Sequence, residues 1–218
     1  MNDIILIGNS SKLKNSLEEL GHKIFSFGRL TKVQFDLNNN FETNFFDNIP
    51  TDKSCYVINV GLLNNLNINN YSEQKAWESI NVNCIGIVRL CEYILTNNSS
   101  ARIIIIGSES GKKGSYDTIY FLAKAALRAY VKERFLSSPD QQLLIISPST
   151  IKDGSMTLKR KDKDRLKNYQ KSHPKKRFLF MKELASYISS IFQIDSSYLT
   201  NTEIELNGGK FSRMKYEK

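Results

Sequence analysis

The chain has 218 residues, of which 40% are hydrophobic, 11% aromatic and 24% charged. This composition is typical of a globular domain, and it excludes a disordered chain, a collagen and a small cystine-rich scaffold. A chain of this length can bury roughly 70% of the surface that its unfolded form exposes. We therefore expect a single domain over residues 1–218, with a core that needs neither disulfides nor a metal.

The net charge of +9 is concentrated in one segment of the chain. Residues 152–177 hold eleven basic and three acidic residues, a net charge of +8, whereas the rest of the chain is nearly neutral. Such a run is typical of a solvated helix face or loop, and it also fits a flap that attracts anions. Tyr169 and Phe178 are the aromatics in or beside this run, and no helix-turn-helix pattern accompanies them. We therefore expect no nucleic-acid partner.

Targeting signals and metal-ligand clusters are both missing from the sequence pattern. The apolar run near the start is too short for a signal peptide, and no later stretch approaches 18 apolar residues. We expect a cytoplasmic protein with no membrane partner.

The three cysteines form no C-x-x-C pair and only two histidines are present, so we expect no metal site. Cys84 and Cys91 lie seven residues apart in a helical pattern, which favours buried small hydrophobic side chains.

Apolar runs and helical periodicities alternate along the chain. In chain order, the predicted elements are a strand over 3–8, a helix over 11–20, strands over 23–29, 33–37 and 54–61, a helix over 73–96, a strand over 101–108, a helix over 117–136, a strand over 143–149, a helix over 181–192 and a last strand over 203–209.

The strands show no polar alternation, and most are separated by helices. This pattern predicts an α/β fold in which a doubly wound parallel sheet carries helices on both faces. Ligands of such folds bind beyond the carboxyl ends of the strands. The loops that begin at Gly8, Arg29, Asn59, Ser108 and Pro148 should therefore converge on one cleft.

The most informative motif is Y-x-x-x-K, formed by Tyr120 and Lys124 near the start of a predicted helix. It follows a buried strand that ends at Ser108, twelve residues before the tyrosine. Residues at i and i+4 share one helix face, so the Lys124 ammonium can lie near the Tyr120 phenol. We expect this charge to lower the pKa of Tyr120 from about 10 toward neutrality, as suits a general acid/base.

These motifs resemble the short-chain dehydrogenase/reductase family, and the resemblance runs through essentially the whole chain in order. It implies a Rossmann fold and an NAD(P)-dependent oxidoreductase, with Tyr120 as the general acid/base and Ser108 bound to the substrate oxygen. Lys124 would also hold the nicotinamide ribose. Asn83, in I-N-V-N-C-I-G, matches the family's V-N-x-x-G and would hold a water that relays protons to Lys124.

The same resemblance implies a set of cofactor-binding residues. Asp36 would meet the adenine amino group, and Arg29, just beyond the second strand, would meet the 2′-phosphate of NADP. NADP is therefore the predicted cofactor, with NAD as the alternative. The residues implied in cofactor binding are Gly8, Ser10, Ser11, Lys12, Leu13, Arg29, Asp36, Asn59, Gly61, Pro148 and Ile151.

The phosphate loop departs from the family pattern. Lys12 and Lys14 stand at the second and third glycines of G-x-x-x-G-x-G. The missing glycines predict a looser loop, whereas two cations at a helix N-terminus favour phosphates. Ser149 replaces the glycine that usually follows Pro148, and Asp153 is nearest in register to an expected threonine.

Together these features predict hydride transfer between NADP(H) and a carbonyl or secondary alcohol. Residues 152–177 would form the substrate flap, and their charge predicts an anionic small-molecule substrate: a sugar phosphate, a nucleotide-linked sugar or a carrier-bound acyl group. The family commonly pairs helices equivalent to 73–96 and 117–136 between subunits, which predicts a homodimer or homotetramer. The apolar residues that suggest such a surface are Trp77, Phe121, Leu127 and Tyr130.

Two alternatives from other functional classes stay open at this point. The lysine-substituted loop also fits a catalytically reduced nucleotide-binding, regulatory or scaffold protein on the same fold. A basic-surface module for nucleic acid is the second alternative.

Overall fold

The computed structural model describes residues 2–42, 44–194 and 197–212. Its centre is a six-stranded sheet in the order β2-β1-β3-β4-β5-β6, in which every neighbouring pair is parallel. The strands are β1 (Asp3–Ile7), β2 (Lys23–Phe27), β3 (Cys55–Ile58), β4 (Arg102–Ile106), β5 (Gln142–Pro148) and β6 (Thr202–Leu206). The predicted α/β fold class is confirmed.

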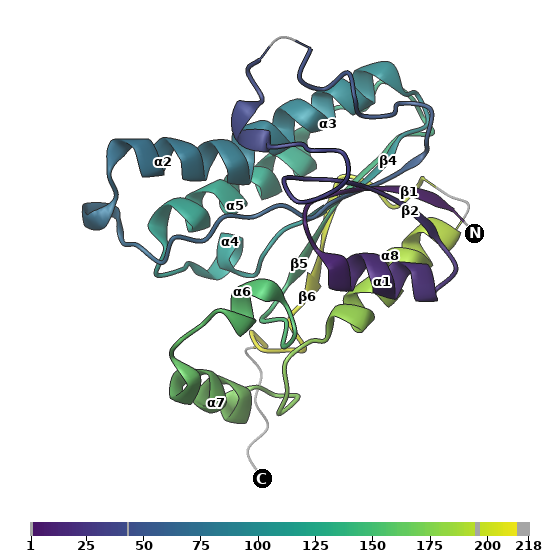
Figure 1. Ribbon diagram of the computed structural model, residues 1–218. Helices are drawn as coiled ribbons and strands as arrows, with labels where there is room; N and C mark the ends of the chain where they lie inside the picture. Colours follow the sequence, from purple (N-terminus) through teal and green to yellow (C-terminus); the bar gives the residue numbers. More distant parts are fainter. Residues whose placement is uncertain (1, 43, 195–196, 213–218) are drawn as a thin grey trace.

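Helices cover both faces of the sheet (Figure 1). On one face lie α1 (Ser11–Glu19) and α8 (Met181–Gln193), and on the other lie α2 (Glu73–Ile80), α3 (Gly86–Asn97) and α5 (Thr118–Glu133). Successive strand residues point to opposite faces, so Ile4 and Leu6 join the core beneath α1 and α8. Ile5 and Ile7 join the core beneath α3 and α5. Because both faces are covered, the strands are apolar at consecutive positions.

One predicted strand is wrong. Within residues 33–37, Val33 makes only an isolated bridge to Phe27, and Leu37 starts the 3₁₀-helix η1 (Leu37–Asn39). Phe35 instead stacks on Phe45, with ring centroids 4.6 Å apart, and is buried in the core. The apolar side chains of Phe35 and Leu37 therefore pack on the core, and this segment does not add a strand to the sheet.

The predicted helix over 73–96 is interrupted. Between α2 and α3 the chain forms a π-helical turn, η3 (Asn81–Ile85). The Asn83 amide donates to the backbone oxygens of Ser79, one turn earlier, and of Leu62, outside the helix. Such turns mark positions where a tertiary contact competes with regular helix bonds. Cys91 is buried in the core, as expected, whereas Cys84 is only partly buried.

The segment after β5 contains two short helices that the sequence pattern did not predict. They are α6 (Ser155–Leu158) and α7 (Lys163–Ser172), and with their connections they form the basic segment 152–177, named the flap below. The flap lies beyond the carboxyl ends of β5 and β6, at lower left in Figure 1. A third short helix, α4 (Ser110–Lys113), follows β4, and the 3₁₀-helix η2 (Ile68–Asn70) precedes α2.

Gly8 packs the end of β1 tightly against its neighbours. Its φ of 129° lies in a region that side chains rarely adopt, and a Cβ would stand 2.2 Å from the Asn59 carbonyl oxygen. Its N–H donates to Phe27 O at 2.8 Å. The loop that leads into α1 is therefore fixed between the ends of β2 and β3.

Candidate functional site

Lys124 lies at the centre of the candidate site. It is 1% exposed, and its Nζ donates to the carbonyl oxygens of Val60, at 3.1 Å, and Ile106, at 3.4 Å. Ile106 is the last residue of β4 and Val60 follows the end of β3 by two residues, so the side chain joins α5 to the carboxyl edge of the sheet. Burial lowers the pKa of Lys124 to about 8, because the charged ammonium is deprived of water.

Tyr120 lies one helical turn before Lys124 and is also buried. The Lys124 Nζ is 5.7 Å from the centroid of the Tyr120 ring. Burial raises the pKa of Tyr120, whereas a hydrogen bond with the Ser108 side chain acts in the opposite direction. The expected lowering of this pKa is therefore wrong for this structure, because desolvation outweighs the stabilisation of the phenolate.

Asn83 ties the loop after β3 to the helix behind it. Its Oδ1 accepts from Leu62 N at 2.8 Å, and its Nδ2 donates to Leu62 O at 2.8 Å. A Cβ on Gly61 would stand 3.7 Å from Asn83 Oδ1 and 3.9 Å from Tyr120 Cε2. Asn83, Tyr120 and the loop at Gly61 therefore line the same space.

Asp117, which is not among the predicted site residues, positions the start of α5. Its carboxylate accepts from Tyr120 N at 3.1 Å as the N-cap, from the Tyr71 hydroxyl at 2.6 Å, and from the backbone amides of Asn64 and Asn65. The helix that carries the Y-x-x-x-K motif is thus anchored to the loop after β3. An aspartate three residues before Tyr120 is the N-cap signal that could have identified it.

The N-terminus of α1 offers backbone donors. Ser10 caps the helix by accepting from Leu13 N at 3.3 Å. Among the described residues, the backbone N–H groups of Ser11 and Lys12 have no acceptor. Free amides at the start of a nine-residue helix suit a phosphate group. These residues therefore fit the pyrophosphate of a dinucleotide.

The two lysines of this loop have different surroundings. Lys12 Nζ lies 3.4 Å from Asp153 of the flap, across the start of α1, whereas Lys14 pairs along the helix with Glu18 at 3.7 Å. Asp153 also accepts from Met181 N at 2.9 Å. The start of the flap is thereby attached to both helices on one face of the sheet.

The other predicted cofactor residues are distributed around the same edge. Arg29 is exposed directly after β2, where Leu30 N donates to the side chain of Asn9 at 3.1 Å. Asp36 caps η1 through Asn38 N. Leu13 is fully buried against the sheet, so its side chain is not available to a ligand.

Three further predicted cofactor residues lie at strand ends. Asn59 follows β3, Pro148 ends β5, and Ile151 forms an isolated bridge with Leu179 at the base of the flap.

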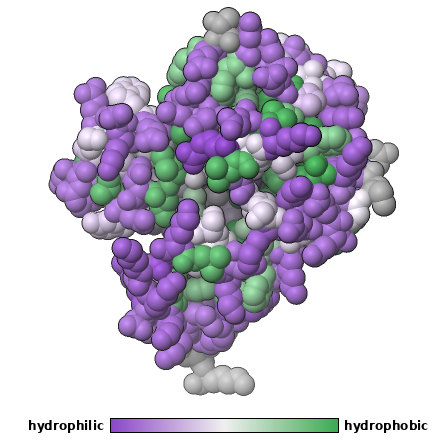
Figure 2. Space-filling view, in the orientation of Figure 1, coloured by the Kyte–Doolittle hydropathy of each residue, from purple (hydrophilic) through white to green (hydrophobic). Residues whose placement is uncertain are grey.

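The flap reaches over the space beside Tyr120. A Cβ on Gly61 would stand 2.9 Å from Met156 Cε. The Met156 side chain of α6 therefore packs close to the loop at Gly61. Figure 2 shows that hydrophilic side chains cover most of this face, the flap included. In the described part of the chain, no group of three His, Cys, Asp or Glu side chains could hold a metal, and no helix could span a membrane.

Comparison with known proteins identifies one family model and many related folds. Residues 52–210 match the family described as Enoyl-(Acyl carrier protein) reductase. No curated protein sequence matches the chain.

Three solved structures illustrate the fold similarity. A variant of ElxO with NADPH bound has a TM-score of 0.81 at 17% identity, over 98% of this chain and 100% of that one. A glucose/ribitol dehydrogenase from Brucella melitensis has a TM-score of 0.81 at 19% identity, over 96% of both chains. Aldohexose dehydrogenase from Thermoplasma acidophilum has a TM-score of 0.76 at 18% identity, over 100% of this chain and 97% of that one. At these identities the likeness concerns the fold alone.

The depressed pKa of Lys124 predicts a specific pH dependence of stability. Below pH 8 the folded protein holds a buried charge, and this penalty disappears as the pH rises toward 10.5, the ordinary lysine value. The free energy of unfolding of the wild type should therefore rise by about 2–3 kcal/mol, relative to Lys124→Met, between about pH 7 and pH 10. Urea denaturation at both pH values measures this difference.

Lys132→Met is the matched control, because Lys132 is exposed on the same helix. Its stability should follow the wild type at both pH values. If the difference between wild type and Lys124→Met stays constant with pH, the ammonium is not desolvated as described.

Proposed function

The chain belongs to the short-chain dehydrogenase/reductase family of NAD(P)-dependent oxidoreductases, and we propose that it transfers hydride between NADP(H) and a carbonyl or secondary alcohol. The matched residues 52–210 include Asn83, Ser108, Tyr120 and Lys124. The observation that carries the proposal is the contact of Tyr120 with Ser108, one helical turn from a buried Lys124.

Three of these side chains, Ser108, Tyr120 and Lys124, have distinct parts in the proposed reaction. Ser108 donates a hydrogen bond to the substrate oxygen and orients it, and Tyr120 delivers a proton to that oxygen. Tyr120 is protonated near pH 7, as the proton donor in carbonyl reduction must be, while its burial also raises its pKa and makes the phenol a weaker acid. The Lys124 ammonium stabilises the phenolate that remains. NADP(H), when bound, supplies or accepts the hydride.

The proposed cofactor contacts follow the carboxyl edge of the sheet. The backbone amides of Ser11 and Lys12 bind the pyrophosphate, with the loops at Gly8, Asn59, Gly61 and Pro148 beside them. These are the contacts that the helix N-terminus and the strand ends make available. Ile151 contacts the nicotinamide carboxamide, and Arg29 binds the 2′-phosphate, so NADP is the proposed cofactor over NAD.

The proposed substrate is anionic. The flap is the segment beside Tyr120 with the largest charge excess, and its lysines are mostly exposed to solvent. A positive field over the site raises the local concentration of anions and their association rate. A sugar phosphate, a nucleotide-linked sugar or a carrier-bound acyl group would meet this requirement. The cytoplasm is the proposed location.

The lysine-substituted loop supports a second candidate function. The Lys12 side chain already has a carboxylate partner, Asp153, which competes with phosphate for the ammonium. A loop with weakened cofactor affinity fits a regulatory or nucleotide-binding protein that no longer turns over substrate.

A homodimer or homotetramer is the proposed assembly, formed through α2 and α5, which pack against each other. Trp77 is 62% exposed on α2, Leu122 is exposed on α5, and Phe135 is exposed beyond the end of α5. Leu127, predicted as a surface residue, is instead fully buried in the core. Phe121 and Tyr130 are partly buried, and Tyr130 bonds Glu92.

Sedimentation velocity measures the assembly. We expect a dimer or tetramer for the wild type and a shift toward monomer for Trp77→Glu, because a charge at an apolar contact is unfavourable. Tyr198→Glu alters a distant exposed aromatic and should not change the mass. A 25 kDa wild-type species would contradict the proposal.

Replacing Tyr120 separates the two candidate functions. Tyr120→Phe removes the proton donor and should lower kcat about 10²–10⁴-fold, with NADPH binding retained. Tyr116→Phe is the control, because Tyr116 is an exposed tyrosine of the same segment and its hydroxyl has no assigned part. Turnover is followed by NADPH absorbance across carbonyl compounds. A Tyr120→Phe protein with full turnover would contradict the acid/base assignment.

Cofactor choice is tested by titration with NADPH and with NADH, following nicotinamide fluorescence. Arg29→Ala should weaken NADPH binding about tenfold or more and leave NADH binding nearly unchanged, because only NADPH carries the 2′-phosphate. Lys32→Ala removes an exposed charge three residues away and should affect neither. If neither dinucleotide binds the wild type, the regulatory alternative is favoured.

A further inference from the structure

The loop that carries Ser108 is joined to the ends of the next two strands of the sheet. Glu109 N donates at 3.0 Å to the carbonyl oxygen of Pro148, the last residue of β5. Ser149 N, one residue later, donates to Leu206 O at the end of β6, also at 3.0 Å. The carboxyl ends of β4, β5 and β6 are therefore bonded in series beside Ser108.

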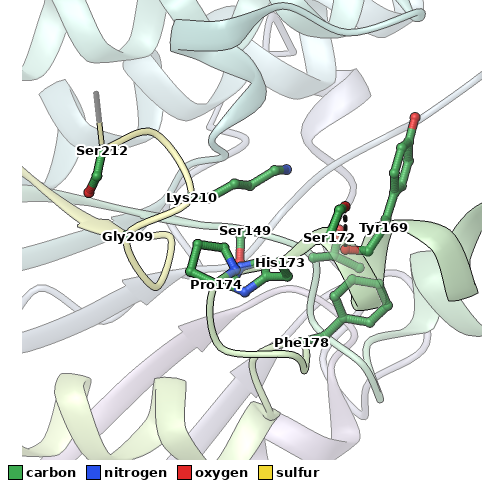
Figure 3. Close-up of a pocket in the computed structure, with 10 residues that line it drawn as sticks. Ser149, Tyr169, Ser172, His173, Pro174, Phe178, Gly209, Lys210 and Ser212 are labelled. Atoms are coloured by element: carbon green, nitrogen blue, oxygen red, sulfur yellow. Dashed lines mark hydrogen bonds between the residues drawn. The ribbon is translucent and has the colours of Figure 1, made fainter. Parts of the chain in front are cut away.

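The side chain of Glu109 makes a second connection, to the segment that follows β6 (residues 207–212). Glu109 Oε1 accepts from Lys210 Nζ at 2.7 Å. Figure 3 shows Lys210 on this segment, beside the cavity of about 420 Å³ that lies between it and the flap. The ion pair closes a ring, because the Ser108 loop is held through the backbones of β5 and β6 and also by a side chain of the segment that continues β6.

Glu109 depends on this pair because little of its side chain reaches water. The side chain is 16% exposed, against 37% for that of Lys210. Its second oxygen, Oε2, is buried and has no hydrogen-bond partner within the described residues. A shielded carboxylate that loses its counter-ion is strongly unfavourable. Without Lys210, the Glu109 side chain should therefore move toward solvent and displace its own backbone.

The backbone of Glu109 in turn fixes the Ser108 hydroxyl. Ser108 Oγ accepts from Ser110 N at 3.1 Å. That N–H lies in the peptide plane that joins Glu109 to Ser110, so a rotation of the Glu109 backbone redirects the donor. While Oγ accepts this bond, the hydroxyl proton stays free for another acceptor. The hydrogen bond between Ser108 and Tyr120 therefore depends on how Glu109 is held.

We propose that Glu109 is a positioning residue for Ser108, and that Lys210 keeps it in place. The pair holds the backbone that directs the Ser108 hydroxyl toward Tyr120 and the substrate oxygen. This inference rests on the proposed function for the part that Ser108 plays in the reaction. The placement of Ser108 itself can be measured without turnover.

A second ion pair between neighbouring elements offers a matched control. Lys112 of α4 pairs with Glu205 of β6, and both side chains are partly exposed. Lys112→Met removes the same charge as Lys210→Met, but it leaves the partner of Glu109 in place. The Ser108 hydroxyl should therefore stay where it is in Lys112→Met.

Amide hydrogen exchange, followed by NMR, measures the placement of Ser108, because Ser108 Oγ is the acceptor of the Ser110 amide. Lys210→Met should speed exchange at Ser110 about tenfold or more, and Lys112→Met less than about twofold. The amide of Ile104, in the middle of β4, reports opening of the whole sheet. Its exchange should be unchanged in both variants.

Steady-state kinetics measure the consequence for the reaction. Lys210→Met should lower kcat for carbonyl reduction about tenfold or more and leave KM for NADPH within about twofold, because a misplaced hydroxyl acts on the transition state. Lys210→Arg keeps the cation and should restore most of kcat. Glu109→Ala combined with Lys210→Met should be no slower than Lys210→Met alone, because the two side chains act as one unit. A contact that only supports the fold would not separate kcat from KM in this way.

The outcomes separate this proposal from the proposed function. In an active wild type the proposal requires both changes in Lys210→Met, and faster exchange alone or lower kcat alone overturns it. Equal effects of Lys112→Met and Lys210→Met also overturn it, because the ion pairs would then only attach the segment after β6. If the wild type turns over no carbonyl compound while Lys210→Met still speeds exchange at Ser110, Glu109 positions Ser108 as proposed and the oxidoreductase proposal fails.

Discussion

The buried ammonium of Lys124 is the constraint on which the site depends. Burying a charged group to 1% exposure is costly, and the carbonyls of Val60 and Ile106 offset part of that cost by accepting hydrogen bonds from two of the three N–H groups of the ammonium. These carbonyls come from the ends of β3 and β4, so the strands must end where they do for the lysine to remain buried. The register of the sheet and the position of α5 are thereby coupled through one side chain.

Two other polar residues extend this coupling to the loops. Asp117 caps α5 and holds the backbone of Asn64 and Asn65, while Asn83 holds Leu62 from the opposite side. The loop after β3 is therefore bound at both ends to helices. Tyr120 meets Ser108 in a space whose walls are set by hydrogen bonds, which is the kind of support a preorganised site requires.

Much of the fold was predictable from the sequence. Continuous apolar runs that alternate with segments of helical periodicity are typical of a parallel sheet covered by helices on both faces. The placement of Lys124 and Ser108 beside Tyr120 was also predictable, since a four-residue spacing and a strand end are local features. The direction of the pKa shift of Tyr120 was not predictable, because it is set by burial under segments that are distant in the sequence. Phe35 was misassigned for a similar reason: its partner Phe45 is ten residues away, and no local pattern indicates stacking.

The positions of the phosphate loop differ in how well they tolerate a different side chain. At Gly8 any side chain would collide with the Asn59 carbonyl, so the fold itself forbids change there. The Lys12 and Lys14 side chains instead project from helix α1 toward partly exposed carboxylates, those of Asp153 and Glu18. Positions 12 and 14 can therefore take other side chains without a collision like that at Gly8, although a negative charge there would face Asp153 or Glu18. The two positions at which this loop lacks the glycines of the family motif are thus positions where a side chain meets no backbone obstacle.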